Sequence, residues 1–306
     1  MPPRLILNAD DFGLTPGINR AIAELHAAGA LTSATLMASG PAFDDAIRTA
    51  HAHPTLGIGC HIVLTDGTPI SPPHTIPTLL GPDRKTFRPS LPSFFRDALL
   101  NRIAPADIAR EAQAQIERIQ QQGIPLTHLD THKHTHILPQ IARPLLAVAE
   151  RTGVPAIRNP FEPPWSIALG RSPILRNLQL RSLRHLQPRF LALPQIRSGI
   201  VRTTTGTLGI SATGQLNPTT LGNILNAMPD GLWELVCHPG YNDRDLDAIT
   251  TRLRSTREVE LAALLAAFSK TSQSTPHPSH VKLINYRDAY TEQQTDALRS
   301  PPGRTQ

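Results

Sequence analysis

Two adjacent carboxylates near the N-terminus are the first side chains of this sequence that could do chemistry. Asp10 and Asp11 follow the apolar run at residues 5–7, in the stretch LILNADDFG. Neighbouring carboxylates repel each other unless a cation relieves the repulsion. At the frayed end of a strand, one could bind a metal while the other takes a proton from the water that the metal activates. Alone, the stretch is also compatible with a turn in which an aspartate caps a helix.

A histidine-rich segment supplies imidazoles of the kind that bind divalent metals. In LTHLDTHKHTH, Asp130 is followed by His132, His134 and His136, and His61 lies in the separate stretch LGIGCHIVL. Mixed carboxylate and imidazole ligands, with positions left for water, are typical of a hydrolytic metal centre. The alternating spacing does not decide which of the three histidines would bind, although His132 and His136 would share one face of a helix. Alone, the segment could also be a metal-binding surface tract or a polar loop.

His238, in the stretch WELVCHPG, is a further candidate for acid–base chemistry. A histidine before Pro-Gly could equally end a strand without a catalytic role. The two cysteines of the chain, Cys60 and Cys237, each precede a candidate histidine. Because neighbouring side chains of a strand point to opposite faces, we interpret both cysteines as packing residues behind the site and not as ligands.

The elements that would position these groups alternate between short apolar runs and helical patterns. This order predicts a parallel sheet, and seven or eight repeats favour a barrel. The carboxyl ends of barrel strands meet at one rim, so we expect the candidate groups to converge there. The predicted strands are residues 4–8, 33–38, 56–64, 126–130, 154–158, 199–202, 232–237 and 281–286. The predicted helices are a first one from Pro16 to the stop at Gly29, and residues 106–122, 141–152, 219–227 and 252–269.

Composition limits the class of protein and the compartment. The 306 residues carry a net charge of +6, but aromatic residues make up only 4%, which argues against a stacking platform for nucleic acid. The sequence predicts no membrane-spanning segment and no secretory signal. Two distant cysteines favour a reducing cytoplasm. We expect one domain over residues 1–289, with an Arg-rich insertion at about 163–197 and a polar, flexible tail over residues 290–306.

The Arg-rich insertion departs from the barrel pattern. From residue 163 to residue 228 there is no Asp or Glu, and seven arginines occur. A helix beginning at Ser172-Pro173 would present Ile174, Leu175, Leu178, Leu183 and Leu186 on one half and Arg176, Arg181 and Arg184 on the other, with Leu180 on the basic half. Such a helix could cover the barrel with its apolar half and leave its basic half in solvent. It could also lie in a membrane interface with its arginines toward anionic headgroups.

Five stretches of the sequence, in this order, resemble the YdjC-type carbohydrate deacetylases: NADDFG, TSATLMASGPAFDDA, LGIGCHIVLTDGTPI, THLDTHKHTHILP and ELVCHPGYND. The resemblance covers about residues 5–286 and is greatest to the branch associated with hopanoid biosynthesis. It implies a distorted (β/α) barrel of about seven parallel strands that removes an acetyl group from an N-acetylated sugar with the help of a metal.

The resemblance also implies roles for individual residues. Asp11, His61 and His132 would be metal ligands, Asp10 the general base and His238 the general acid.

Four further residues match positions near the site, where they would orient the base or hold the sugar: Asp130, His136, Arg158 and Tyr241. One divalent ion, Zn²⁺ or Mg²⁺, is implied, and two histidines with one aspartate suit zinc.

The implied substrate is an N-acetylglucosaminyl group on a hopanoid lipid. The enzyme would then be cytoplasmic, with peripheral contact to the inner face of the membrane. Alternatives are deacetylation of soluble chito-oligosaccharides and a non-catalytic carbohydrate- or lipid-binding protein. A nucleic-acid-binding protein is a further hypothesis that rests on the net positive charge alone, and no recognised nucleic-acid-binding motif supports it.

Overall fold

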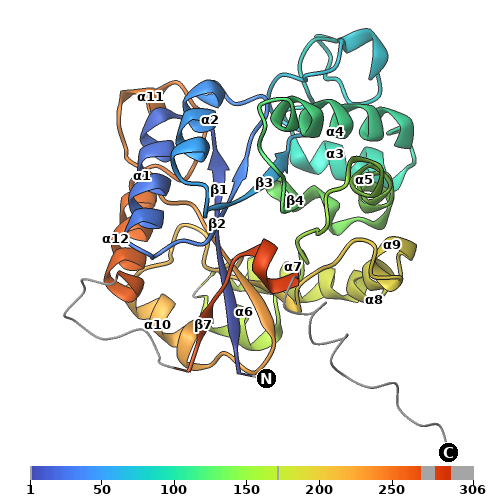
Figure 1. Cartoon of the computed structure of the whole chain (residues 1–306). Coiled ribbons are helices and arrows are strands. Elements are labelled where there is room, and N and C mark those ends of the chain that lie inside the picture. Colours follow the sequence, from blue (N-terminus) through green and yellow to red (C-terminus); the bar gives the residue numbers. More distant parts are fainter. Residues whose placement is uncertain (1, 171, 270–279, 291–306) are drawn as a thin grey trace, which may run out of the picture.

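A curled sheet of parallel strands surrounded by helices forms the body of the protein in a computed structural model (Figure 1). The structure describes residues 2–170, 172–269 and 280–290. Every pairing between the named strands is parallel. The predicted α/β barrel class is therefore confirmed.

The strands and helices have the following bounds. The strands are β1 (Arg4–Phe12), β2 (Ser33–Leu36), β3 (Gly57–Ile62), β4 (His128–Thr131), β5 (Gly206–Leu208), β6 (Leu232–Cys237) and β7 (Lys282–Leu283). The helices are α1 (Pro16–Ala27), α2 (Phe43–Ala52), α3 (Leu91–Leu99), α4 (Pro105–Gln120), α5 (Pro139–Thr152), α6 (Pro164–Leu169), α7 (Ile174–Leu183), α8 (Gln187–Leu191), α9 (Pro194–Arg197), α10 (Pro218–Asn226), α11 (Arg244–Asp247) and α12 (Ser255–Phe268). Short 3₁₀ helices are η1 (Pro73–Thr75), η2 (His132–Ile137) and η3 (Arg184–Leu186).

One short segment brings the two edges of the sheet together. The strand order is β4-β3-β2-β1-β6-β5, with β7 beside β1. Between the edges lies the closing segment, residues 155–158. It bonds to Leu129 of β4 on one side and to Arg202, just ahead of β5, on the other. The curl is thus nearly closed into a barrel, but the last contacts are isolated bridges and not full strands.

The predicted elements differ from the observed ones mainly at this closure. Residues 154–158 and 199–202 contribute only single bridges, at Ala156, Ile157 and Arg202, and the strand that pairs with β6 starts later, at Gly206. The single-domain division stays a prediction. Residues 291–306 of the predicted tail lie outside the described residues.

The side chains of β1 alternate between the surrounding helices and the barrel interior. Leu5 and Leu7 belong to the large apolar core. Ile6 belongs to a separate small cluster, and Asn8 and Asp10 follow it at two-residue intervals on the same face. The interior of the barrel therefore changes from apolar to polar toward the carboxyl end of the strand.

Strands β3 and β4 carry the same alternation in matching register. Gly59 pairs with His128, and His61 pairs with Asp130. A Cβ atom on Gly59 would lie 2.5 to 2.7 Å from three atoms of the His128 ring, so this position has room only for glycine. The register places His61 directly beside Asp130.

The Arg-rich insertion folds with its apolar residues partly outward. Ile174, Leu175 and Leu178 on α7 are 87%, 67% and 63% exposed. Arg176 and Arg184 instead donate hydrogen bonds into the body of the protein, to the carbonyls of Ile210 (2.7 Å) and Glu162 (2.8 Å).

The prediction that this helix covers the barrel with its apolar half is therefore wrong for its first turns. Only the later residues Leu183 and Leu186 pack against the core. Arg171 lies outside the described residues. Within the described part of the chain, no helix is long and apolar enough to cross a bilayer.

Candidate metal centre

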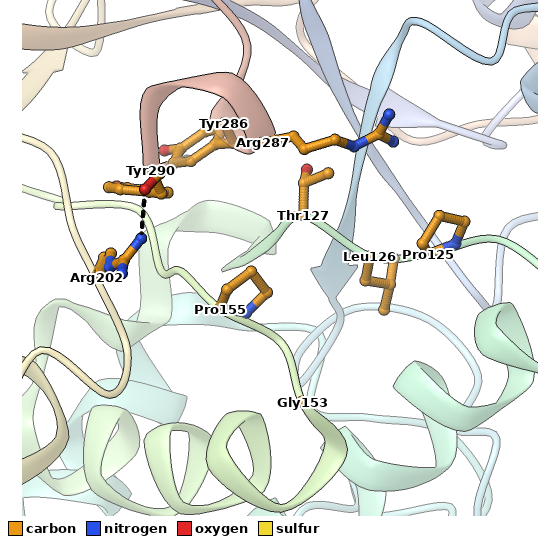
Figure 2. A pocket seen from close by; sticks show the side chains of 9 residues that line it. All are labelled: Pro125, Leu126, Thr127, Gly153, Pro155, Arg202, Tyr286, Arg287 and Tyr290. Atoms are coloured by element: carbon orange, nitrogen blue, oxygen red, sulfur yellow. Dashed lines mark hydrogen bonds between the residues drawn. The ribbon is translucent and has the colours of Figure 1, made fainter. Parts of the chain in front are cut away.

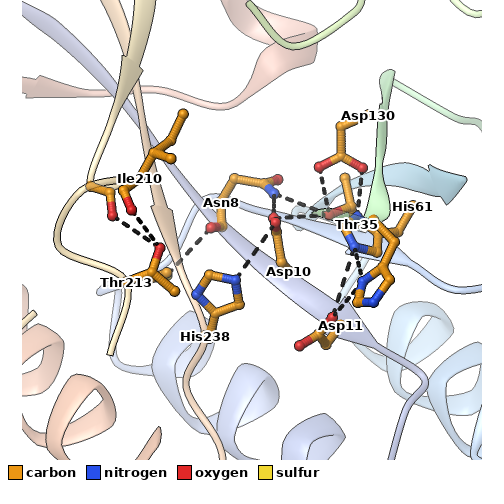
Figure 3. Close-up of polar contacts among 12 residues, drawn as sticks. Asn8, Asp10, Asp11, Thr35, His61, Asp130, Ile210, Thr213 and His238 are labelled. Carbon is orange, nitrogen blue, oxygen red and sulfur yellow. Dashed lines mark hydrogen bonds and ion pairs between the residues drawn. The ribbon is translucent and has the colours of Figure 1, made fainter. Parts of the chain in front are cut away.

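Strand β1 is irregular where the two carboxylates emerge. Its pairing with β2 shifts register between Ala9 and Phe12, and Asp11 has a φ of 65°, in the left-handed region. In a regular strand Asp10 and Asp11 would point to opposite faces, but Figure 3 shows both reaching groups of the same cluster. The sequence predicts a frayed strand end at this point, but the strand does not fray. A local bulge brings the two acids together.

Three donor atoms lie close enough together to hold one ion. Asp11 Oδ1 is 3.8 Å from His61 Nε2 and 3.6 Å from His132 Nδ1, and the two ring nitrogens are 3.3 Å apart. Ligands about 2.1 Å from a tetrahedral ion lie roughly 3.4 Å from one another. The set therefore fits a divalent metal, and it matches one of two groups of suitable side chains among the described residues.

The second such group consists of Asp10, His61 and Asp130. It is the poorer candidate because Arg158 already forms ion pairs with both of its carboxylates.

Buried partners orient the two candidate ligands on β1 and β3. His61 Nδ1 lies 2.7 Å from Asp130 Oδ1, which leaves Nε2 facing Asp11, and a carboxylate behind a histidine is a common support of metal ligands. Burial alone would lower the pKa of His61, but Asp130 and the other nearby acids raise it to about 9. Arg257 Nη2 binds Asp11 Oδ2 at 2.6 Å, so Oδ1 stays available to the metal.

The turn after β4 separates the three histidines that the sequence left open. His132 faces Asp11. Lys133 and His134 then adopt left-handed conformations, with φ of 57° and 52°. His136 is fully buried, and its ring nitrogens contact Thr131 Oγ1 (2.7 Å) and the Arg158 carbonyl (3.2 Å). Of the three, only His132 joins a group that could hold a metal.

Asp10 is held by an arginine that also binds two other acids. Arg158, fully buried, contacts Asp10 Oδ1 and Oδ2 at 2.6 and 2.9 Å. It also pairs with Asp130 at 2.5 Å and with Glu234 at 2.7 Å. Burial would raise the pKa of Asp10, but Arg158 and the neighbouring His61 hold it well below its usual range. Asp10 is therefore ionised, and the contacts of Arg158 support orientation of this carboxylate, not contact with a sugar.

His238 lies on the other side of Asp10 (Figure 3). Its Nε2 is 3.9 Å from Asp10 Oδ2. Its backbone N–H donates to Glu260 Oε2 at 2.6 Å. Burial raises the pKa of Glu260. The site thus has an ionised acid and an imidazole facing each other beside the candidate metal ligands, which is a suitable arrangement for hydrolysis.

The side chain of Tyr241 contacts helix α1 and not this cluster. Its hydroxyl donates to Glu24 of α1 at 2.5 Å, and the Arg20 guanidinium lies 4.1 Å from the centre of its ring. Its aromatic face is thus already covered on one side by α1.

One pocket lies near the opposite ends of the strands, where β4 starts (Figure 2). Thr127, Arg202 and Tyr290 are among the residues that line this cavity of about 310 Å³. It contains none of the candidate metal ligands.

The sequence did not single out several residues that now contact the site. Glu234 lies four residues before His238 in a strand that is otherwise apolar, which was a usable signal of an inward-facing acid. Arg257 and Glu260 lie on α12, far along the chain from the site residues. Nothing in a single sequence connects them to Asp11 or His238.

Comparison with known proteins identifies the family. A model of YdjC-like proteins matches residues 4–271. The chain belongs to the YdjC-like family. The names of these relatives do not confirm the branch associated with hopanoid biosynthesis.

The curated relatives of this YdjC-like chain include several carbohydrate deacetylases. The one from Brevibacillus brevis is 42% identical over 158 residues, 52% of this chain and 60% of the relative. The one from Thermoanaerobacter pseudethanolicus is 27% identical over 256 residues, 84% of this chain and 88% of the relative. The match to the first curated relatives thus spans only about 60% of their length.

A solved structure shares the fold. The protein of Enterococcus faecalis V583, described as a cellobiose-phosphate cleavage protein, has a TM-score of 0.72 and 24% identity, covering 94% of this chain and 99% of its own.

Proposed function

We propose that this protein is a metal-dependent carbohydrate deacetylase that hydrolyses the N-acetyl group of an amino sugar. The observation that carries the proposal is that Asp11, His61 and His132 come within ligand distance of one another, with Asp10 and His238 alongside. The curated relatives named carbohydrate deacetylase supply the reaction class.

Each residue of the site has a role that follows from its contacts. Asp11, His61 and His132 would hold the metal. When bound, it would polarise the acetyl carbonyl and lower the pKa of a water molecule. Asp10 would accept a proton from the water that attacks the acetyl carbon.

His238, whose Nε2 faces Asp10, would protonate the amine nitrogen as the C–N bond breaks. Arg158 keeps Asp10 aligned through two hydrogen bonds. It also keeps this carboxylate ionised, so Asp10 is ready to accept a proton but is a weak base. The site therefore needs the acidified water that a metal provides.

For the substrate, we favour an N-acetylglucosaminyl group on a hopanoid lipid, with one zinc ion as cofactor. The exposed apolar start of α7 and the acid-free, Arg-rich insertion support a lipid-linked acceptor and a cytoplasmic protein that touches the inner membrane surface. Deacetylation of soluble chito-oligosaccharides is the alternative. The two share the same chemistry at the acetyl group.

The deciding experiment incubates purified protein and a divalent metal with N-acetylglucosaminyl hopanoid and, separately, with N,N′-diacetylchitobiose. Mass spectrometry should show loss of one acetyl group, and in competition the lipid-linked acceptor should be consumed first. Equal or faster consumption of chitobiose would assign the enzyme to soluble sugars. If neither acceptor loses its acetyl group with any added metal, the deacetylase proposal fails.

A pair of isosteric variants tests the division of labour between the two aspartates. Asp10→Asn should still bind the metal but lose turnover by about 10² to 10⁴-fold, because the acceptor of the water proton is gone. Asp11→Asn should lose metal binding itself, as measured by calorimetry. Asparagine tolerates the left-handed backbone at this position, so the comparison isolates the charge. An Asp10→Asn enzyme with full kcat would show that Asp10 is not the base.

A further inference from the structure

Helix α12 places two fully buried charged side chains against the site. Arg257 and Glu260, one turn apart, are each 1% exposed. Charged groups are rarely buried so completely unless they are paired or functional. Arg257 is paired with Asp11. The contacts of Glu260 lead to His238.

Glu260 holds the backbone of His238 and faces its ring. Glu260 Oε2 accepts the N–H of His238 at 2.6 Å, and Oε1 accepts the N–H of Gly214 at 3.1 Å. The same Oε2 lies 4.0 Å from Nδ1 of the His238 ring. That nitrogen is buried and makes no hydrogen bond within the described part of the chain. A small rotation of the ring would bring Nδ1–H into hydrogen-bond distance of the carboxylate.

The ring of His238 therefore lies between two acids. Nε2 faces Asp10 and Nδ1 faces Glu260. An imidazole whose Nδ1 carries a proton toward a buried carboxylate has its Nε2 fixed in one tautomer and one orientation. Nε2 is then the nitrogen that faces Asp10 and can exchange a proton there.

We propose that Glu260 is a positioning residue for His238, the general acid of the proposed reaction. The inference rests on the proposed deacetylase function. As the C–N bond of the acetamide breaks, the proton on His238 Nε2 passes to the departing nitrogen, and the acetyl group leaves as acetate. Glu260 neither gains nor loses a proton. It holds the Nδ1–H and stabilises the imidazolium before the proton is transferred.

The first test compares Glu260→Gln with Glu258→Gln, an exposed neighbour on the same helix. Glu260→Gln should lower kcat for the N-acetyl sugar by about 10²-fold or more, with KM and metal affinity unchanged. Hydrolysis of 4-nitrophenyl acetate, whose leaving group needs no proton, should fall by less than about threefold. Glu258→Gln should match the wild type on both substrates. Equal losses on both substrates, or no loss on the amide, would overturn the proposal.

A second measurement needs no variant and no turnover. In ¹⁵N-histidine NMR spectra of the wild-type protein, the neutral ring of His238 should carry its proton on Nδ1. A neutral ring protonated on Nε2 with a bare Nδ1 would contradict the role of Glu260. If the wild type hydrolyses no N-acetyl sugar, the proposed function fails, while this spectrum still reports on the contact between Glu260 and His238.

Discussion

At the residue scale, the site depends on the backbone of Asp11 as much as on its charge. The left-handed conformation of a non-glycine residue costs about 1 kcal/mol, and strain of this kind persists where the surroundings enforce it. Here the enforcing contact is Arg257, which holds Asp11 Oδ2 at 2.6 Å and lies within 3.5 Å of the His238 carbonyl. Burial would raise the pKa of Asp11, but Arg257 and His132 hold it well below its usual range.

The arginine should therefore control metal affinity. Arg257→Met keeps most of the side-chain volume but frees the second oxygen of Asp11. We expect the metal dissociation constant to increase by about 10- to 100-fold, as measured by calorimetry with Zn²⁺. Arg252→Met, on the exposed segment before α12, is the matched control and should bind as the wild type does. Equal affinities in the two variants would show that Arg257 does not orient the ligand.

At the element scale, α7 is attached through Arg176 and presents the apolar side chains of its first turns outward. Arg176 binds the Ile210 carbonyl in the loop after β5. The backbone N–H groups of Gly214, in the same loop, and of His238 both donate to Glu260. Because α7 is bonded to a loop that borders the site, a lipid surface that covers its apolar side chains would hold the site close to lipid-linked substrates.

Vesicle binding tests this role of α7. The protein should sediment with anionic liposomes, less so at high salt. Changing Ile174, Leu175 and Leu178 to Ser should reduce binding by about tenfold or more because their burial in the lipid interface is lost. Replacing the exposed Arg181 by Ser should have a smaller effect, about 1 kcal/mol. As the control, Leu99 and Leu100 are replaced by Ser. These residues lie on and just after α3 and are 58% and 53% exposed. Absence of the wild type from the pellet at every salt concentration would exclude membrane contact.

At the scale of the whole molecule, a column of polar contacts runs through the barrel. The Tyr286 hydroxyl donates to Glu234 Oε2 at 2.5 Å. Glu234 binds Arg158, and Arg158 binds Asp10 and Asp130. Three buried carboxylates thus share one guanidinium, so a neutral replacement of Arg158 would leave them without their buried cation.

How much of the fold and of the candidate site could be predicted depended on whether the signal in the sequence was local. The strand ends predicted the meeting of Asp10, Asp11, His61 and His238, because parallel strands place their carboxyl ends at one rim. The bulge at Asp11 was not predictable, because register between strands is a tertiary property. The orientation of α7 was not predictable either, since the helical wheel shows that two faces differ but not which one the rest of the chain covers.

The metal-free protein should lose stability as pH rises from about 6.5 to about 9. The pKa of His61 is near 6.5 in an unfolded chain and about 9 in the fold. Its protonated form therefore stabilises the fold fully below pH 6.5, and this contribution, on the order of 3 kcal/mol, disappears as pH passes 9. The melting temperature of metal-free protein should fall over this range. Added Zn²⁺ should stabilise the protein increasingly over the same range, because it binds the neutral ring. If the melting temperature of the metal-free protein did not change over this pH range, the pairing of His61 with Asp130 would be contradicted.

The closing segment couples local opening of the barrel to the orientation of Asp10. The backbone N–H of Arg158 bonds to Leu129 at the edge of the sheet, while its side chain holds Asp10. Four backbone hydrogen bonds join the closing segment to Leu129 and Arg202, and a local opening of the fold at this edge would break them. Each such opening here would withdraw the guanidinium from Asp10. The fraction of time that the barrel spends closed is thus also the fraction of time that Asp10 is aligned by Arg158, and the two should change together with temperature or denaturant.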